Sequence, residues 1–257
     1  MTRIESYEDL ADNIVDWLKD YYWQYNIKAF VVGVSGGIDS AVVSSLCART
    51  GLPTYVVCMP LESKFENTRL SDAHSKALVE KYDNVKRVEV ELFSAYDSLI
   101  KSIEWWSEAQ HFDKKEFTSS ELANANTKSR MRMITLYQIA GSVGGIVVGT
   151  GNKVEDYGVG FYTKYGDGGV DIAPIADLYK TEVWELGEYL EVDQRIVDAD
   201  PTDGLWKDSR SDEDQLGATY AELEEAMETG TGPAVEVLKK FNEQNKHKME
   251  PIPTFKL

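Results

Sequence analysis

The stretch Val31-Val32-Gly33-Val34-Ser35-Gly36-Gly37-Ile38-Asp39-Ser40 decides the fold, because it joins an apolar run to a helix through a Ser-Gly-Gly turn. Gly36 and Gly37 let the backbone adopt angles closed to other residues and approach a ligand closely. The first N–H groups of the following helix then face an anion, and the helix dipole favours negative charge there. Ser35 and Ser40 add hydroxyl donors, and Asp39 is placed to hold a Mg²⁺ ion shared with phosphates. The stretch therefore predicts a phosphate-binding loop after a buried strand.

This loop differs from two familiar nucleotide-binding loops. A Walker A loop needs GxxxxGK[ST], and no lysine follows these glycines. The GxGxxG fingerprint of dinucleotide-binding enzymes is also missing from the sequence. The pattern SGGxDS instead resembles the loop of the N-type ATP pyrophosphatases, which split ATP between its α and β phosphates. A glycine turn that binds no ligand is the alternative interpretation.

The composition indicates a folded protein of the cytoplasm. The chain has 257 residues, 42% of them hydrophobic, and we expect residues 1–257 to form a single domain. No stretch approaches the ~20 apolar residues of a membrane span, and no secretory signal is visible. Cys47 and Cys58 suit buried thiols in a reducing compartment and offer no zinc site. The formal net charge of −17 repels nucleic acids, and acids such as Glu222, Glu224 and Glu225 are expected on solvated helix faces.

Hydrophobic periodicity predicts strands that alternate with helices. The expected strands are 28–34, 54–59, 85–91 and 145–149, and the expected helices between and before them are 6–24, 38–50, 67–82 and 121–140. This alternation indicates an α/β fold with a doubly wound parallel sheet, whose ligands bind at the carboxyl ends of the strands. Residues 95–117 are hard to place, and 150–178 are expected to be irregular. Further helices are expected at 180–190, 212–228 and 232–244.

Motifs in the second half extend the pattern over nearly the whole chain. In order they are SGGIDS at 35–40, NTKSRMRM at 126–133, GTGNKVE at 149–155, TKYGDGGVD at 163–171, PTDGLW at 201–206, SDEDQLG at 211–217 and the pair His247-Lys248. This series resembles ammonia-dependent NAD synthetase. The resemblance implies an adenine-nucleotide alpha-hydrolase-like fold with a five-stranded sheet. It also implies a two-step ligase that amidates deamido-NAD⁺ to NAD⁺ through an acyl-adenylate and releases AMP and pyrophosphate.

The resemblance also assigns residues to ligands. The expected ATP contacts are Gly33, Val34, Ser35, Gly36, Gly37, Ile38, Asp39, Ser40, Thr150, Lys180 and Thr202. The expected Mg²⁺ carboxylates are Asp39 and Glu155. The expected deamido-NAD⁺ contacts are Arg130, Lys164, Asp171, His247 and Lys248. Lys180 is expected to stabilise charge as pyrophosphate leaves, Asp39 to act in catalysis through the metal, and Asp167 to orient substrate or ammonia.

Further expectations concern the oligomeric state, the nitrogen source and the alternative functions. The family implies a homodimer, and free ammonia is the expected nitrogen source, because neither cysteine sits beside a base as an amidase nucleophile would. Between Glu155 and Lys164 the chain is one residue longer than many members of the family. His74 and His111 have no partner motif and are expected to be structural or exposed. The alternatives are another ATP pyrophosphatase that amidates or thiolates a different nucleotide or a tRNA, and a nucleotide sensor without turnover.

Overall fold

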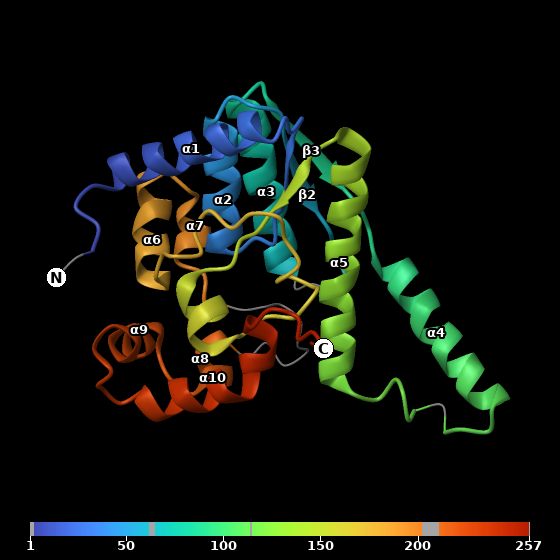
Figure 1. Ribbon diagram of the computed structural model, residues 1–257. Coiled ribbons are helices and arrows are strands. Elements are labelled where there is room, and N and C mark those ends of the chain that lie inside the picture. Colours follow the sequence, from blue (N-terminus) through green and yellow to red (C-terminus); the bar gives the residue numbers. More distant parts are fainter. Residues whose placement is uncertain (1–2, 62–64, 114, 202–210, 257) are drawn as a thin grey trace.

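A parallel sheet forms the centre of the molecule in the computed structural model, which describes residues 3–61, 65–113, 115–201 and 211–256 (Figure 1). Its strands are β1 (Phe30–Gly33), β2 (Thr54–Cys58), β3 (Val85–Glu89) and β4 (Ile146–Val148). They lie in the order β3-β2-β1-β4, and all neighbours are parallel. The chain runs outward from β1 to β3 and then returns to the other side of β1. The order therefore reverses between β1 and β4, which is where such sheets bind ligands.

Helices cover both faces of this sheet. One face carries α1 (Tyr7–Gln24), α2 (Ile38–Arg49) and α3 (Phe65–Lys81), and beside them α6 (Lys180–Tyr189) and α7 (Gln194–Val197). The other face carries α5 (Glu121–Val143), and α4 (Phe93–Ala109) stands farther out (Figure 1). The doubly wound α/β architecture predicted from the sequence is confirmed.

Alternation along the strands explains the two covered faces. Phe30 and Val32 belong to the buried cluster that α1, α2 and α6 complete. Val31 and Val57 point the other way and pack with Ala140 of α5. Because both faces are buried, the strands read as continuous apolar runs, as is usual in parallel sheets.

A further group of helices packs at the carboxyl end of β4. It comprises η1 (Lys153–Val159), a π-helix, with α8 (Asp212–Leu216), α9 (Tyr220–Thr229) and α10 (Val235–Met249). Val154, Tyr220 and Leu223 are fully buried in the cluster that these helices share. Helices α9 and α10 therefore fix the position of η1, and α9 also contacts α6, beside the point between β1 and β4 where the strand order reverses.

The prediction of five strands is wrong for the part of the chain that the structure describes, where the sheet has four. Ile172 lies beside Val148 as a single parallel bridge at the position of a fifth strand. The N–H of Gly149 donates to the carbonyl of Ile172 at 2.7 Å. Pairing ends there because Pro174, two residues later, has no N–H to continue the ladder.

Three expected segments differ from the structure. The helix expected at 212–228 is two helices, because Gly217 takes a left-handed conformation (φ +75°) and Thr219 caps a new start. The irregular stretch 150–178 contains the π-helix η1. The stretch 95–117 that resisted placement contains most of α4, where Trp105 and Trp106 lie largely exposed.

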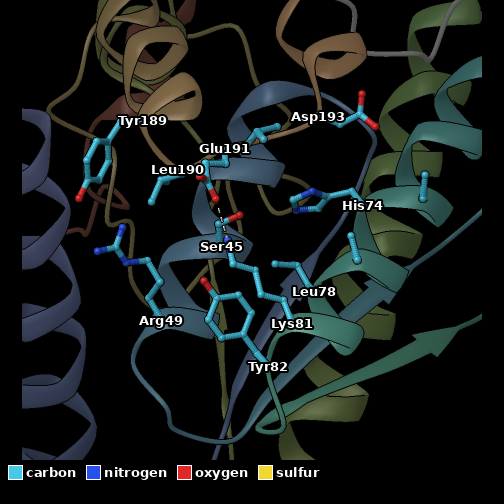
Figure 2. A pocket seen from close by; sticks show the side chains of 13 residues that line it. Ser45, Arg49, His74, Leu78, Lys81, Tyr82, Tyr189, Leu190, Glu191 and Asp193 are labelled. Carbon is cyan, nitrogen blue, oxygen red and sulfur yellow. Dashed lines mark hydrogen bonds and ion pairs between the residues drawn. The ribbon is translucent and has the colours of Figure 1, made fainter.

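A cavity of about 640 Å³ lies between α2, α3 and the α6–α7 segment (Figure 2). His74 lines it, is buried, and lies 2.9 Å from the Ser44 hydroxyl through its Nε2. Burial lowers the pKa of His74 to about 4. His74 is therefore a neutral structural residue, in keeping with the expectation, and the cavity contains none of the expected site residues.

Candidate active site

The phosphate-binding loop is held by its own serines. The hydroxyls of Ser35 and Ser40 lie 3.0 Å apart, and the Ser40 hydroxyl also accepts the N–H of Ser35 at 3.1 Å. The Ser40 hydroxyl donates to the carbonyl of Gly37 at 3.0 Å. Gly36 has φ +93°, and a Cβ at this position would lie 2.4 Å from the backbone oxygen of Asn67. The turn therefore requires glycine at this position for both conformation and space.

Helix α2 starts at this loop and directs its N-terminus toward the carboxyl edge of the sheet. Its N-cap residue is Gly37, which has no side chain to accept a hydrogen bond from the first turn. The first N–H groups of a helix need partners, and an anion can supply them. The structure thus presents an uncapped helix N-terminus beside the serine hydroxyls.

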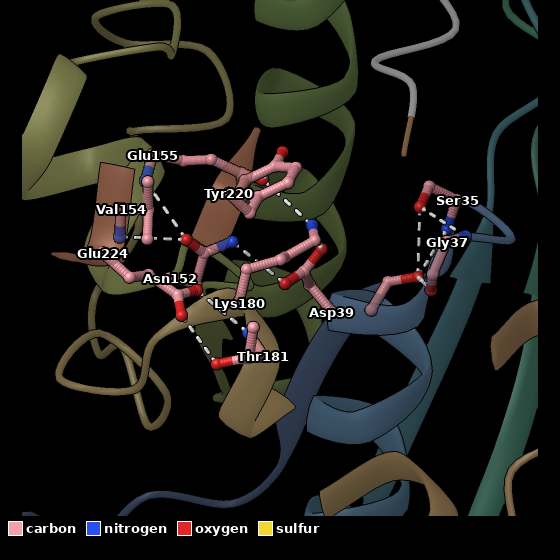
Figure 3. A network of polar contacts seen from close by, with 11 residues as sticks. Ser35, Gly37, Asp39, Asn152, Val154, Glu155, Lys180, Thr181, Tyr220 and Glu224 are labelled. Carbon is pink, nitrogen blue, oxygen red and sulfur yellow. Dashed lines mark hydrogen bonds and ion pairs between the residues drawn. The ribbon is translucent and has the colours of Figure 1, made fainter. Parts of the chain in front are cut away.

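Lys180 lies at the centre of a buried polar network next to this loop (Figure 3). Its Nζ is 2.6 Å from Asp39 Oδ2 and 2.9 Å from Glu155 Oε1. Asp39 comes from the first turn of α2, Glu155 from η1 and Lys180 from the first residue of α6. Lys180 is only 2% exposed, so it is not the solvated lysine that a helix start would otherwise suggest.

Two further side chains hold the carboxylates. The Nδ2 of Asn152 donates to Asp39 Oδ1 at 3.1 Å, while its Oδ1 accepts the N–H groups of Val154 and Glu155 and so caps η1. The hydroxyl of Tyr220 donates to Glu155 Oε1 at 2.7 Å. Both carboxylates are therefore fixed by neutral donors as well as by Lys180.

Burial and charge act against each other in this network. Burial alone would lower the pKa of Lys180, but Asp39 and Glu155 outweigh it and raise that pKa, so the lysine stays protonated. Burial acts to raise the pKa of Glu155, yet Lys180 and the Tyr220 hydroxyl lower it overall. Burial raises the pKa of Asp39 in spite of Lys180. Glu155 is thus the more firmly ionised of the two carboxylates.

The pair Asp39 and Glu155 fits a Mg²⁺ ion. Oxygens from the two carboxylates lie within hydrogen-bond distance of a single nitrogen, so they converge on one cation. Mg²⁺ prefers hard oxygen ligands and takes one or two carboxylates together with substrate phosphates. The neighbouring helix N-terminus and serine hydroxyls are the donors that such phosphates need. Charge and donor type therefore agree at this site.

Comparison with known protein families shows which family this chain belongs to. The family model described as NAD synthase matches residues 10–253. The chain belongs to the NAD synthase family. A curated relative from Carboxydothermus hydrogenoformans, an NH(3)-dependent NAD(+) synthetase, is 35% identical over 246 residues, which are 95% of this chain and 95% of the relative.

Solved structures of this family agree with the fold. An NMN synthetase from Francisella tularensis superposes with a TM-score of 0.85 at 31% identity, covering 99% of this chain and 100% of the other. An NH3-dependent NAD synthetase from Campylobacter jejuni, solved with nitrate, gives a TM-score of 0.76 at 25% identity, covering 98% and 100%. The likeness therefore extends over both chains from end to end.

Four of the residues expected to contact the second substrate lie together. Arg130 on α5 donates through Nε and Nη2 to the carbonyl of Lys164, both at 3.3 Å. The Nζ of Lys164 donates to the carbonyl of His247 on α10 at 3.0 Å. Lys248 donates to the carbonyls of Gly160 and Tyr162 at 2.5 and 2.9 Å. Helix α10 thus brings the His247-Lys248 pair to the loop after η1.

The two aspartates of the glycine-rich block are held by different neighbours. Asp167 Oδ1 accepts the Ser129 hydroxyl at 2.6 Å and the N–H of Thr163 at 3.1 Å. Part of Asp167 is exposed to solvent, but its carboxyl group is surrounded by protein. This burial raises the pKa of Asp167, although the hydrogen bonds from Ser129 and Thr163 act to lower it. Asp171 accepts the Tyr137 hydroxyl at 3.0 Å and the N–H of Val147 at 2.7 Å. Both Asp171 oxygens thus bind the protein itself, and its expected substrate contact stays a prediction.

The remaining expected ATP contacts are Thr150 and Thr202. Thr150 is the second residue after β4, and the carboxyl ends of β4 and β1 meet at the same edge because the two strands are parallel neighbours. Thr202 lies outside the described residues. The loop residues from Gly33 to Ser40 all lie at the end of β1 and the start of α2, as expected.

Sequence reasoning missed four polar side chains of this site. Asn152 stands inside the quoted motif GTGNKVE, and its place one residue before η1 marks it as a cap. Asp156 follows Glu155, and burial together with Glu155 and Asp167 raises the pKa of Asp156 to about 8. Tyr220 and Glu224 carry no motif signal, because their contacts depend on how α9 packs.

Glu224 corrects an expectation directly. It is 9% exposed rather than solvated, and its Oε1 accepts the N–H of Thr181 at 3.0 Å while its Oε2 accepts the Thr181 hydroxyl at 2.6 Å. Its charge lies against the first turn of α6, where the helix dipole favours a carboxylate. Glu224 thus stabilises the helix end that carries Lys180.

Proposed function

We propose that this protein amidates deamido-NAD⁺ to NAD⁺ with ATP and free ammonia. In the first step an oxygen of the nicotinate carboxylate attacks the α-phosphorus of ATP, the bond to the β-phosphate breaks, and pyrophosphate leaves. In the second step ammonia attacks the acyl carbon, gives up a proton, and AMP leaves with its oxygen. The observation that carries this proposal is the buried Lys180, bridging Asp39 and Glu155 beside an uncapped helix N-terminus.

The chain's own groups account for the first step. The N–H groups at the start of α2 and the hydroxyls of Ser35 and Ser40 would bind the triphosphate. Asp39 and Glu155 would hold a Mg²⁺ ion, which neutralises phosphate charge when bound. Lys180 keeps its charge because the two carboxylates raise its pKa, so it can stabilise the negative charge of departing pyrophosphate.

The second substrate would bind near α5 and α10. Arg130 donates to the carbonyl of Lys164, and Lys164 donates to that of His247. The neighbouring Lys248 donates to the carbonyls of Gly160 and Tyr162, and arginine and lysine side chains suit a substrate that carries phosphates. We also assign Asp171 to this substrate, and the Tyr137 hydroxyl of α5 holds its carboxylate. Asp167 would orient the nicotinate carboxylate or ammonia, since its carboxylate is fixed by Ser129 and Thr163.

Free ammonia is the proposed nitrogen source. The curated relative that spans 95% of this chain is named for dependence on NH3. Cys47 and Cys58 are buried, and burial raises the pKa of the Cys47 thiol, which makes it a poor nucleophile.

The homodimer and the cellular setting are part of the proposal. Helix α4 leaves Leu99, Trp105 and Trp106 exposed at 42%, 71% and 49%, and an apolar surface of this kind suits a second copy of the chain. No helix among the described residues is long and apolar enough to span a membrane. The charge of −17 disfavours nucleic acids and suits a cytoplasmic enzyme of small molecules. Light scattering of the wild type and of Trp105→Ser tests the dimer, and a wild-type monomer would contradict it.

The decisive assay follows NAD⁺ formation from deamido-NAD⁺, Mg²⁺-ATP and ammonium, with glutamine in place of ammonium as the comparison. We expect one AMP and one pyrophosphate for each NAD⁺, with ammonium alone. AMP release that needs no deamido-NAD⁺, or no product at low and high salt, would contradict the proposal.

A second acceptor is favoured by one comparison. The Francisella tularensis structure, named as an NMN synthetase, superposes with a TM-score of 0.85, against 0.76 for the Campylobacter jejuni NAD synthetase. The same carboxylate-to-amide chemistry on nicotinate mononucleotide would give NMN. Parallel kcat/KM measurements with the two acceptors decide between them, and a ratio above about tenfold corresponds to a difference of ~1.4 kcal/mol in transition-state binding.

A further inference from the structure

Tyr220 belongs to the network around Lys180, although no sequence motif predicts that it does. It is the first residue of α9, 65 residues beyond Glu155, and it is only 1% exposed. Its hydroxyl donates to Glu155 Oε1 at 2.7 Å, and the same oxygen receives Lys180 Nζ at 2.9 Å (Figure 3). A single oxygen of the expected metal ligand therefore receives one neutral donor and one charged donor.

The ring of Tyr220 contacts the network as well as its hydroxyl does. Lys180 Nζ lies 5.1 Å from the ring centroid, within the range of a cation–π contact. Tyr220 thus touches both the carboxylate and the lysine, and it defines where the two meet. A movement of the ring would shift Glu155 and Lys180 together.

The surroundings of Tyr220 leave its ring little freedom. Trp184 packs edge-on against it, with centroids 5.8 Å apart and an interplanar angle of 85°. Its backbone N–H donates to Glu213 Oε1 of α8 at 2.9 Å, and Thr219 caps the helix at the preceding residue. Helices α6, α8 and α9 therefore fix the hydroxyl in advance of any ligand.

We propose that Tyr220 is a positioning residue that holds Glu155 in the orientation required to share a Mg²⁺ ion with Asp39 and the ATP phosphates. The strongest other contact of the Glu155 carboxylate is with Lys180, whose charge is also needed by the phosphates. The Tyr220 hydroxyl keeps Glu155 aimed at the site when Lys180 turns toward ATP. This inference rests on the proposed use of Mg²⁺-ATP but not on the identity of the acceptor.

Tyr220→Phe tests the proposal, because it removes the hydroxyl and retains the ring, its packing and its contact with Lys180. The Mg²⁺ concentration that half-saturates binding of α,β-methylene-ATP, measured by calorimetry, should rise about 10- to 100-fold, as is typical when the partner of a metal ligand is lost. Turnover should show the same shift and recover at high Mg²⁺, while the KM for ammonium stays unchanged.

Tyr22→Phe is the matched control. Tyr22 is also buried, and its hydroxyl donates to the carbonyl of Lys28 at 3.3 Å. Lys28 lies just before β1, whereas the phosphate-binding loop follows the other end of that strand. It should lose a similar amount of stability and leave the Mg²⁺ dependence unchanged. In Glu155→Gln the additional Tyr220→Phe change should add little, since Tyr220 acts through Glu155.

The outcomes separate cleanly. An unchanged Mg²⁺ dependence in Tyr220→Phe, or effects of the two substitutions that add fully, would overturn the role of Tyr220. A Tyr220→Phe protein that does not fold would also overturn it, because the hydroxyl would then be structural. Binding of the ATP analogue is measured without an acceptor, so a wild type that binds it but makes no NAD⁺ would count against the proposed function alone.

Discussion

Replacing Lys180 with Met should destabilise the metal-free protein strongly. Lys180 is 2% exposed, and its Nζ lies 2.6 and 2.9 Å from the two carboxylates that it neutralises. Removing one member of a buried ion pair leaves buried charge without a partner and costs about 3–5 kcal/mol. In a protein of this size each kcal/mol lowers Tm by ~2–4 °C, so we expect a fall of roughly 6–20 °C.

Urea denaturation at pH 7 with a chelator measures this loss, and Lys153→Met is the matched control. Lys153 also pairs with a carboxylate, Asp177, at 2.7 Å, but Asp177 has an 84% exposed side chain. An exposed pair contributes about 0–1 kcal/mol, so the control should remain close to the wild type. Both variants remove one positive charge, but Lys180 is buried between two carboxylates and Lys153 pairs with a single exposed one.

The loss should depend on pH and on Mg²⁺. Without Lys180, burial raises the folded-state pKa of Asp39 and Glu155 above the unfolded value. In Lys180→Met the two carboxyl groups therefore favour the folded state when they are protonated, below their pKa in the unfolded chain. This stability is lost as the pH rises through their pKa in the folded protein. The deficit of Lys180→Met should therefore be full at pH 7 and small near pH 4, and Mg²⁺ should restore part of it at pH 7. A deficit under about 1 kcal/mol, or one that neither acid nor Mg²⁺ reduces, would refute the buried network.

Three further changes test other parts of the molecule. Asp39→Asn should lower NAD⁺ formation by at least about 100-fold with an unchanged circular dichroism spectrum, since a metal carboxylate is worth several kcal/mol; near-full turnover would exclude this site. Gly36→Ala should abolish binding of the ATP analogue in calorimetry, because the new Cβ would meet the Asn67 oxygen at 2.4 Å and φ is +93°. Burial lowers the pKa of His74 to about 4, so the folded protein favours the neutral imidazole. The neutral side chain therefore stabilises the fold above pH 6.5, by up to about 3 kcal/mol, and this stability is lost as the pH falls toward 4. Urea titrations should show a smaller pH dependence in His74→Gln, and an equal one would contradict the burial.

Most of the fold could be predicted because local patterns and the sheet agree. The apolar runs that end in Gly33 and Val148 are strands, and the glycines that follow them lie at one edge because parallel neighbours end together. The helix expected from residue 212 begins there, and Ser211 and Asp214 cap it through two reciprocal hydrogen bonds. That the chain is one domain stays a prediction.

The site residues divide according to how far their contacts reach. Asp39, Glu155 and Lys180 stand next to turns and helix starts, so motifs indicate them. Tyr220 contacts Glu155 only because Trp184 and the apolar residues of α9 pack as they do, and no local pattern encodes that packing. Glu224 was expected in solvent for the same reason, since helical periodicity does not reveal which neighbour covers a polar face.

The π-helix η1 occupies most of the segment between Glu155 and Lys164, where the sequence is expected to have one residue more than many members of the family. A π-helix bonds each carbonyl to an N–H five residues later, so its turn is wider than an α-helical turn by about one residue. The N–H of Gly160 donates to the carbonyl of Glu155 across this turn, and Gly160 adopts φ +63° as the turn ends. Asn152 caps η1 and also donates to Asp39, and Glu155 in the first turn of η1 accepts Lys180 Nζ. The wide turn therefore lies on the far side of η1 from the bonds around Asn152, so we expect a change of length in this segment to alter the turn and to leave the network around Lys180 closed.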